Sequence, residues 1–270
     1  MSENKILVPS DFSDASHAAV DLAATIAKKN DMGLSLLHIQ NGKSVGDSKD
    51  QMINIIQSLK VKYNLDTDYI IKKGSIFSDI SRVACEDCYR MMVIGSHGFK
   101  GIREKFFGAD ILKLVKTIPV PVIVAQKNYN IPGSGIKNIV LPAASHDDFH
   151  RIVQATTFIA GIFDAKVHLY TIEKPGQEWP EKLKSNIEKA KEIFDDHKIR
   201  YIRVNEQAST YSVGYSKQTL KYAEGISADM ISLMSMPTKE YHYFADGDKE
   251  QLLTNKAGIP VLCTSDKKAV

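Results

Sequence analysis

The feature that most constrains the fold is that the second half of this 270-residue chain repeats the first. Two pairs of matching segments are displaced by 133 residues, and two further pairs are displaced by 139 residues. Two consistent displacements, separated by one six-residue insertion, predict two copies of one structural unit. The pairs are "NKILVPSDFSDA" (4–15) with "KNIVLPAASHDDF" (137–149), "DMGLSLLHIQ" (31–40) with "DAKVHLYTIE" (164–173), "RMMVIGSHG" (90–98) with "DMISLMSMP" (229–237), and "TIPVPVIVAQ" (117–126) with "KAGIPVLCTS" (256–265).

Within each half, short apolar runs alternate with helical patterns. The first-half runs "KILVP", "LSLLHI", "DYIIKK", "MMVIG" and "VPVIVA" are rich in Val, Ile and Leu, as expected of parallel strands covered on both faces. Ser13 is a predicted N-cap in front of an alanine-rich helical stripe. The pattern predicts an α/β fold with two tandem, doubly wound, five-stranded parallel-sheet domains, 1–130 and 134–270, separated by the linker Pro132-Gly133-Ser134-Gly135.

Composition excludes several function classes from the prediction. The net charge is +3, with Lys and Arg scattered among Asp and Glu, which does not predict a nucleic-acid partner. No apolar run approaches the roughly 18 residues of a membrane span, and the start of the chain does not read as a signal segment. Three cysteines suit a reducing compartment. We therefore expect a cytoplasmic protein with no membrane partner.

Two strand ends carry residues suited to a nucleotide. "VPSDFSD" places Ser10 and Asp11 at the end of the first strand, and "VIGSHG" places Gly95 and Gly98 at the end of the fourth. In parallel sheets, ligands bind beyond the carboxyl ends of the strands. Glycines let backbone N–H groups approach phosphate, a helix starting near Ala109 offers its positive end, and Asp11 can accept from a ribose hydroxyl or an adenine amine. The glycine spacing alone is equally compatible with a loop that only turns.

The whole combination resembles the universal stress protein family in a tandem form. The resemblance rests on the duplicated unit, "ILVPSDFSDAS" at its start, "GSHG" followed by nine residues and Gly108, and the closing "PVPVIV". It implies an adenine nucleotide alpha hydrolase-like fold whose last strands pair edge to edge, making the chain a pseudo-dimer. It also implies an adenine nucleotide ligand, either ATP, with which Mg²⁺ can be bound, or another adenine nucleotide. The implied nucleotide-binding residues are Pro9, Ser10, Asp11 and Ile39 around adenine and ribose, Gly95, His97 and Gly98 at ribose and phosphate, and Gly108, Ala109 and Asp110 at the γ-phosphate end.

The sequence departs from the family pattern at several of these positions. Ala109 stands where nucleotide-binding members carry Ser or Thr, and the missing hydroxyl is worth roughly 1 kcal/mol. The second half departs further, with Ala144, Met234 and Pro237 opposite Asp11, Gly95 and Gly98. We therefore expect one nucleotide site per chain, in the first half.

Three functions remain open at this point. The leading hypothesis is a stress-response protein that binds an adenine nucleotide in a regulatory and not a catalytic role. The sequence has no lysine-bearing P-loop and no convincing acid/base pair, so a slow ATPase is the weaker alternative. A nucleotide-free interaction scaffold is the other alternative, and a homodimer is left open.

Two further motifs are interpreted as structural. Cys85 and Cys88 form a C-x-x-C motif at the end of a predicted helix, where the thiol pKa is not lowered, so ordinary packing is expected. His146 and His150 have i, i+4 spacing, but a solvated helix start is favoured over a metal site. The sequence therefore predicts no metal site and no catalytic residue.

Overall fold

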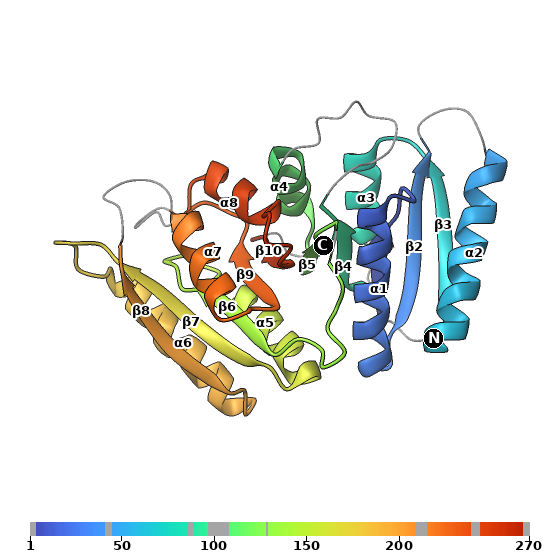
Figure 1. Ribbon diagram of the computed structural model, residues 1–270. Coiled ribbons are helices and arrows are strands. Elements are labelled where there is room, and N and C mark those ends of the chain that lie inside the picture. Colours follow the sequence, from blue (N-terminus) through green and yellow to red (C-terminus); the bar gives the residue numbers. More distant parts are fainter. Residues whose placement is uncertain are drawn as a thin grey trace.

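Figure 1 shows a computed structural model of the chain, which describes residues 4–40, 45–85, 89–96, 108–127, 129–208, 215–238 and 244–266. Strands and helices alternate along the first half, as the hydrophobic pattern predicts. Its elements are β1 (Lys5–Pro9), α1 (Asp14–Lys29), β2 (Gly33–Gln40), α2 (Val45–Tyr63), β3 (Thr67–Lys73), α3 (Ile76–Ala84), β4 (Tyr89–Gly95), α4 (Gly108–Thr117) and β5 (Val122–Ala125).

The second half repeats the same order of strands and helices. Its elements are β6 (Asn138–Pro142), α5 (Phe149–Phe163), β7 (Lys166–Glu173), α6 (Glu181–Asp196), β8 (Tyr201–Gln207), α7 (Tyr215–Gly225), β9 (Met230–Met234), α8 (Asp246–Leu253) and β10 (Val261–Thr264).

All ten of these strands join one continuous sheet in the order β3-β2-β1-β4-β5-β10-β9-β6-β7-β8. Pairing is parallel within each half, and helices pack on both faces of the sheet (Figure 1). In each half the chain winds outward from its first strand in one direction and then in the other. The predicted fold of two doubly wound, five-stranded α/β units is confirmed.

Strand register carries the same internal repeat as the sequence. Lys5 pairs with Gly33, and the residues 133 positions later, Asn138 and Lys166, pair in the same way. Met92 pairs with Val122, and the residues 139 positions later, Ile231 and Val261, do so too. The six additional residues of the second half therefore lie between residues 173 and 229, and the strand pairing on either side of them matches that of the first half.

The two halves meet through their last strands, β5 and β10, which pair antiparallel. Ser265 Oγ donates to the carbonyl of Ile118 at 2.7 Å, and Gln126 Nε2 donates to the carbonyl of Leu253 at 3.0 Å. Helices α4 and α8 lie side by side above this junction (Figure 1). The predicted edge-to-edge pairing is confirmed, and it removes the two strand edges that would otherwise be open to a second chain.

Helix α1 shows how local sequence positions the rest of the first half. Ser13 is its N-cap, as predicted, and its hydroxyl accepts from the backbone N–H of Ser16 at 3.3 Å. The small buried residues Ala15, Ala19 and Ala23 let the helix lie close to the sheet. Among the described residues, no helix is both long and apolar enough to span a lipid bilayer.

Candidate functional site

The candidate site lies where the winding of the first half reverses, between β1 and β4. The chain goes from β1 outward to β2 and β3, then returns to place β4 and β5 on the other side of β1. The carboxyl ends of these strands bring Ser10 and Asp11, from β1, next to Gly95, from β4, with Ile39 from β2 alongside. In an open parallel sheet this switch point is the usual position of a ligand crevice. The tertiary structure therefore brings together the predicted residues of three separate strands.

Asp11 is the residue that organises the turn between β1 and α1. Its side chain is only 8% exposed, and Oδ1 accepts from the backbone N–H of Ser13 at 3.0 Å and from the Ser13 hydroxyl at 2.6 Å. The next residue, Phe12, has a φ of 63°, a left-handed conformation that non-glycine residues rarely adopt. Strain of this kind is concentrated at functional sites, and here the Asp11 carboxylate helps to hold it in place.

A second set of contacts supports the same turn from β2. His38 Nδ1 lies 2.8 Å from the carbonyl oxygen of Ser10, and His38 Nε2 lies 3.3 Å from Ser48 Oγ. Because a carbonyl only accepts, Nδ1 carries the proton in the contact with Ser10. The His38 ring also packs on Phe12, with centroids 4.6 Å apart. His38 therefore positions the turn, a role that the sequence reasoning missed.

Gln40 is a further residue of this edge that the sequence analysis did not single out. It ends β2 beside Ile39, it is buried, and its Nε2 has no hydrogen-bond partner among the described residues. A buried amide donor without a partner costs free energy unless another group, such as a ligand, accepts a hydrogen bond from it. Gln40 therefore adds a hydrogen-bond donor, and Asp11 an acceptor, to the side chains at the carboxyl ends of β2 and β1. A polar residue closing an apolar strand was the available sequence signal.

Two of the predicted glycines have packing reasons of their own. A Cβ added to Gly95 would lie 2.6 Å from the backbone carbonyl of Ala15, so this glycine lets α1 approach the end of β4. A Cβ added to Gly108 would lie 2.7 Å from the carbonyl oxygen of Glu250 in α8. Gly108 is therefore required where the two halves touch, whatever its relation to a ligand.

The other predicted residues complete the description of this edge. Ala109 is exposed in the first turn of α4, and Asp110 follows it at the same positive helix end. A carboxylate in the first turn of a helix is favourable next to the positive helix end. His97 and Gly98 lie outside the described residues, and Pro9 is buried as the last residue of β1.

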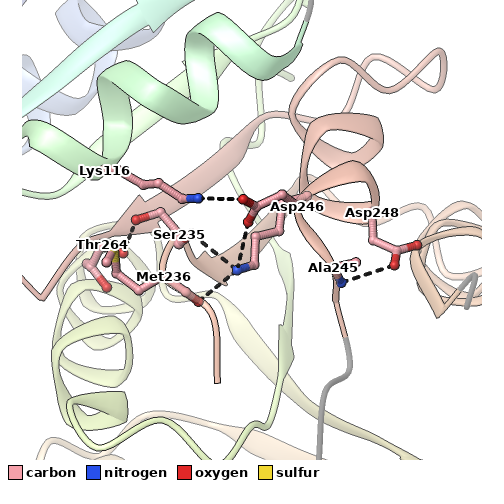
Figure 2. A network of polar contacts seen from close by, with 8 residues as sticks. Lys116, Ser235, Met236, Ala245, Asp246, Asp248 and Thr264 are labelled. Atoms are coloured by element: carbon pink, nitrogen blue, oxygen red, sulfur yellow. Dashed lines mark hydrogen bonds and ion pairs between the residues drawn. The ribbon is translucent and has the colours of Figure 1, made fainter. Parts of the chain in front are cut away.

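The second half differs most at the strand end where the first half carries Ser96. There the side chain of Lys249, which is the repeat partner of Asp110, is 1% exposed and reaches in from α8. Its Nζ donates to the carbonyls of Ser235 at 3.2 Å and Met236 at 2.7 Å (Figure 2). Burial lowers the pKa of Lys249 to about 8. In the second half, a lysine of the chain itself therefore bonds the carbonyls that follow β9.

The same lysine belongs to a network that ties the halves together. Asp246 lies between two ammonium groups, at 2.8 Å from Lys116 Nζ of α4 and at 3.8 Å from Lys249 Nζ (Figure 2). The hydrogen bond from Lys116 is the largest cause that holds the pKa of Asp246 below its usual value. Met234 and Ala144, which replace Gly95 and Asp11, are both buried.

His146 corrects one expectation. It precedes α5 and is 9% exposed, so it is not part of a solvated helix start, whereas His150 is exposed on the helix. Burial, and secondarily the charge of Lys249, lower the pKa of His146 to about 3. The described residues contain no group of three or more His, Cys, Asp or Glu side chains that could hold a metal ion.

The C-x-x-C motif lies only partly within the described residues. Cys85 is exposed and forms the C-cap of α3, whereas Cys88 lies outside the described residues. The position at a helix carboxyl end agrees with the predicted one and does not favour a reactive thiolate.

Comparison with known proteins gives concordant matches. Residues 3–126 match the family model described as the universal stress protein family. The universal stress protein YxiE of Bacillus subtilis (strain 168) is 26% identical in an alignment of 146 positions that covers 46% of this chain and 99% of that protein. The crystal structure of a universal stress protein from Archaeoglobus fulgidus has a TM-score of 0.70 at 14% identity, over 99% of this chain and 100% of that one. A structure from Pseudomonas aeruginosa UCBPP-PA14 has a TM-score of 0.58 at 13% identity, over 97% and 92%. At these identities, the two solved structures share the fold alone.

Proposed function

We propose that this chain, whose residues 3–126 belong to the universal stress protein family, is a cytoplasmic stress-response protein that binds an adenine nucleotide in a regulatory role. The proposed ligand is ATP, with Mg²⁺ bound to its phosphates, or a related adenine nucleotide. The proposed domains are 1–130, which holds the ligand, and 134–270. The observation that carries the proposal is the strained Asp11–Phe12 turn at the switch point between β1 and β4.

The residues of this edge fit a nucleotide in donor and acceptor chemistry. Asp11 accepts from ribose hydroxyls or the adenine amine, and Gln40 Nε2 donates to a purine ring nitrogen. Pro9, Ser10 and Ile39 form the wall beside them. The positive end of α4, from Gly108 to Asp110, is proposed to face the phosphates, and His97 and Gly98 are proposed as further ribose and phosphate contacts. In this arrangement backbone N–H groups do most of the phosphate binding.

We infer one site per chain from the second half. Its strand end holds the Lys249 ammonium on two carbonyls, and buried Met234 replaces Gly95. A nucleotide would have to displace a buried ion-paired side chain, which makes the second edge a poor ligand site.

We infer no catalytic step. Asp11 and His38, the two titratable side chains at this edge whose hydrogen bonds are described above, both hold the turn. Neither is placed to activate a water molecule while it keeps those bonds. Weak ATP hydrolysis is therefore the minor alternative.

Calorimetric titration of the purified chain with ATP, ADP and AMP tests the proposal. We expect saturation at one nucleotide per chain and no measurable phosphate release on the same timescale. Two equivalent sites would contradict the assignment of the second half. Absence of binding by all three nucleotides would favour the scaffold alternative, which is supported by Ala109 and by the packing role of Gly108.

A further inference from the structure

A second candidate site lies between the two halves, at two cavities that adjoin α5. The larger has a volume of about 790 Å³ and the smaller about 350 Å³, and they share the lining residues Arg90, Gln154 and Phe158. The larger volume is within the range of small-molecule sites, which occur preferentially between domains. We call the two together the inter-half groove.

The inter-half groove is distinct from the proposed nucleotide edge. Arg90 is the second residue of β4, and Pro121 immediately precedes β5, so both lie at the amino ends of first-half strands. Asp11 and Gly95 lie at the carboxyl ends of β1 and β4, at the opposite edge of the same sheet. Occupation of one site therefore does not require the other.

The charges of the groove are of one sign. Lys29, Arg90 and Arg151 line it, and no aspartate or glutamate is among the described lining residues of either cavity. Arg90 has no ion pair within the described part of the chain, and its guanidinium carbon lies 5.3 Å from the centroid of the Phe158 ring. One guanidinium nitrogen of Arg151 donates to the carbonyl of Pro119 at 3.1 Å. Two guanidinium groups at one small cavity favour an anionic head group.

The larger cavity combines polar lining residues, among them Asn30, Thr157 and His197, with a continuous set of apolar ones. Phe158 leads from the smaller cavity into the larger one, where Ile162, Ile193 and Ile199 contribute from α5, α6 and the segment before β8. A purely polar anion would leave this surface in water, whereas an unbranched alkyl chain would cover it.

We propose that the inter-half groove binds a fatty carboxylate. The carboxylate lies between Arg90 and Arg151, where it accepts charge-assisted hydrogen bonds, and the alkyl chain lies along Phe158 and the isoleucines. The inference stands on the groove alone and does not depend on nucleotide binding.

Calorimetry with dodecanoate, below its micelle concentration, tests the proposal. We expect saturable binding that weakens about tenfold or more in the Arg90→Gln/Arg151→Gln double variant. Arg203→Gln is the matched control, because Arg203 also lies over an aromatic ring, that of Trp179, with 5.9 Å from its guanidinium carbon to the ring centroid, outside the groove. We expect the control to bind dodecanoate as the parent does.

Two comparison ligands separate the head from the tail. Dodecyltrimethylammonium has the same tail with opposite charge, and acetate has the head without the tail; both are expected to bind about tenfold more weakly or worse. Equal binding of the ammonium ligand, unchanged binding in the double variant, or no dodecanoate binding would overturn the proposal. Light scattering completes the test, because a parent dimer that the double variant dissociates would assign the groove to a second copy of the chain.

Discussion

The two halves of the molecule share a backbone framework and differ at their strand ends. Ser10 N–H donates to the carbonyl of Leu37 at 2.8 Å, and 133 residues later Ala143 N–H donates to that of Tyr170 at the same distance. Yet the first half follows this bond with Asp11 and a left-handed Phe12, whereas the second half has Ala144 there and no such backbone strain at Ser145.

This difference shows that the fold and the ligand chemistry depend on different sets of residues. The fold depends on buried strands and their register, and both survive in the second half with different side chains. Ligand chemistry depends on a few residues beyond the strand ends, and those have changed. The second half uses the same positions for internal contacts, with Lys249 on two carbonyls and Asn186 Nδ2 donating to the carbonyls of Ala144 and His146 at 2.8 and 2.9 Å.

The largest expected effect concerns acid stability of the second half. The pKa of His146 is lowered to about 3 by burial, from 6.5, so between these values the unfolded chain binds the extra proton. Its contribution to stability is present above pH 6.5 and is lost as the pH falls toward 3. We expect His146→Gln to reduce the loss of unfolding free energy between pH 7 and pH 4 by about 3 kcal/mol. Urea unfolding at both pH values measures it, with exposed His150→Gln as the control; equal pH dependence in both variants would refute this assignment.

The next effect separates two glycines that the repeat makes equivalent. A Cβ on Gly108 would lie 2.7 Å from backbone and side-chain atoms of Glu250, whereas a Cβ on Gly247 would meet nothing within 4 Å. We expect Gly108→Ala to lower the unfolding free energy by about 2 kcal/mol, because α4 and α8 must move apart. Gly247→Ala should raise it slightly, by roughly 0.5 kcal/mol, through helix propensity. Thermal unfolding of both variants decides the matter, and similar melting temperatures would mean that the junction is symmetric after all.

A smaller effect is expected on nucleotide affinity. Asp11→Asn keeps an acceptor for the Ser13 N–H while removing the charge, so the turn should survive better than with alanine. We expect adenine nucleotides to bind about tenfold more weakly, with the unfolding free energy changed by less than about 1 kcal/mol. The control is Asp21→Asn, an exposed residue of α1 whose carboxylate lies 3.0 Å from Lys62 Nζ. Unchanged affinity in Asp11→Asn would remove this carboxylate from the site.

The smallest expected effect concerns the affinity for ATP relative to AMP. Ala109 is exposed in the first turn of α4, where a serine hydroxyl could reach the terminal phosphates. Ala109→Ser should tighten ATP binding by roughly 1 kcal/mol, about fivefold, and leave AMP unchanged. Titration of both nucleotides into both proteins measures the difference. An equal gain for AMP would place the hydroxyl away from the γ-phosphate end.

Much of this architecture could be predicted from the sequence, because burial and hydrogen bonding leave a local record. Nearly continuous Val, Ile and Leu runs marked the strands, Ser13 marked the start of α1, and the repeat marked two similar units. The same pattern located Ser10, Asp11 and Gly95 at strand ends, since a parallel sheet sends all its carboxyl ends to one edge. Strands and helix starts are predictable in this way because each depends on residues that are close together in the sequence.

Contacts between distant segments were decided only by the tertiary structure. Gly108 reads as a phosphate-loop glycine until Glu250, 142 positions later, is found against it. Lys249 reads as an ordinary helix lysine until the end of β9 is seen to bury it. His146 reads as exposed until its burial beside Asn186 of α6, and near the charge of Lys249, is seen in the structure. The sequence by itself determined the two repeated α/β units and the positions at which their strands end, because both depend on the local hydrophobic pattern. The polar groups at a strand end can be bonded by a side chain from a distant segment, as Lys249 does after β9. Only the tertiary structure shows at which strand ends this happens.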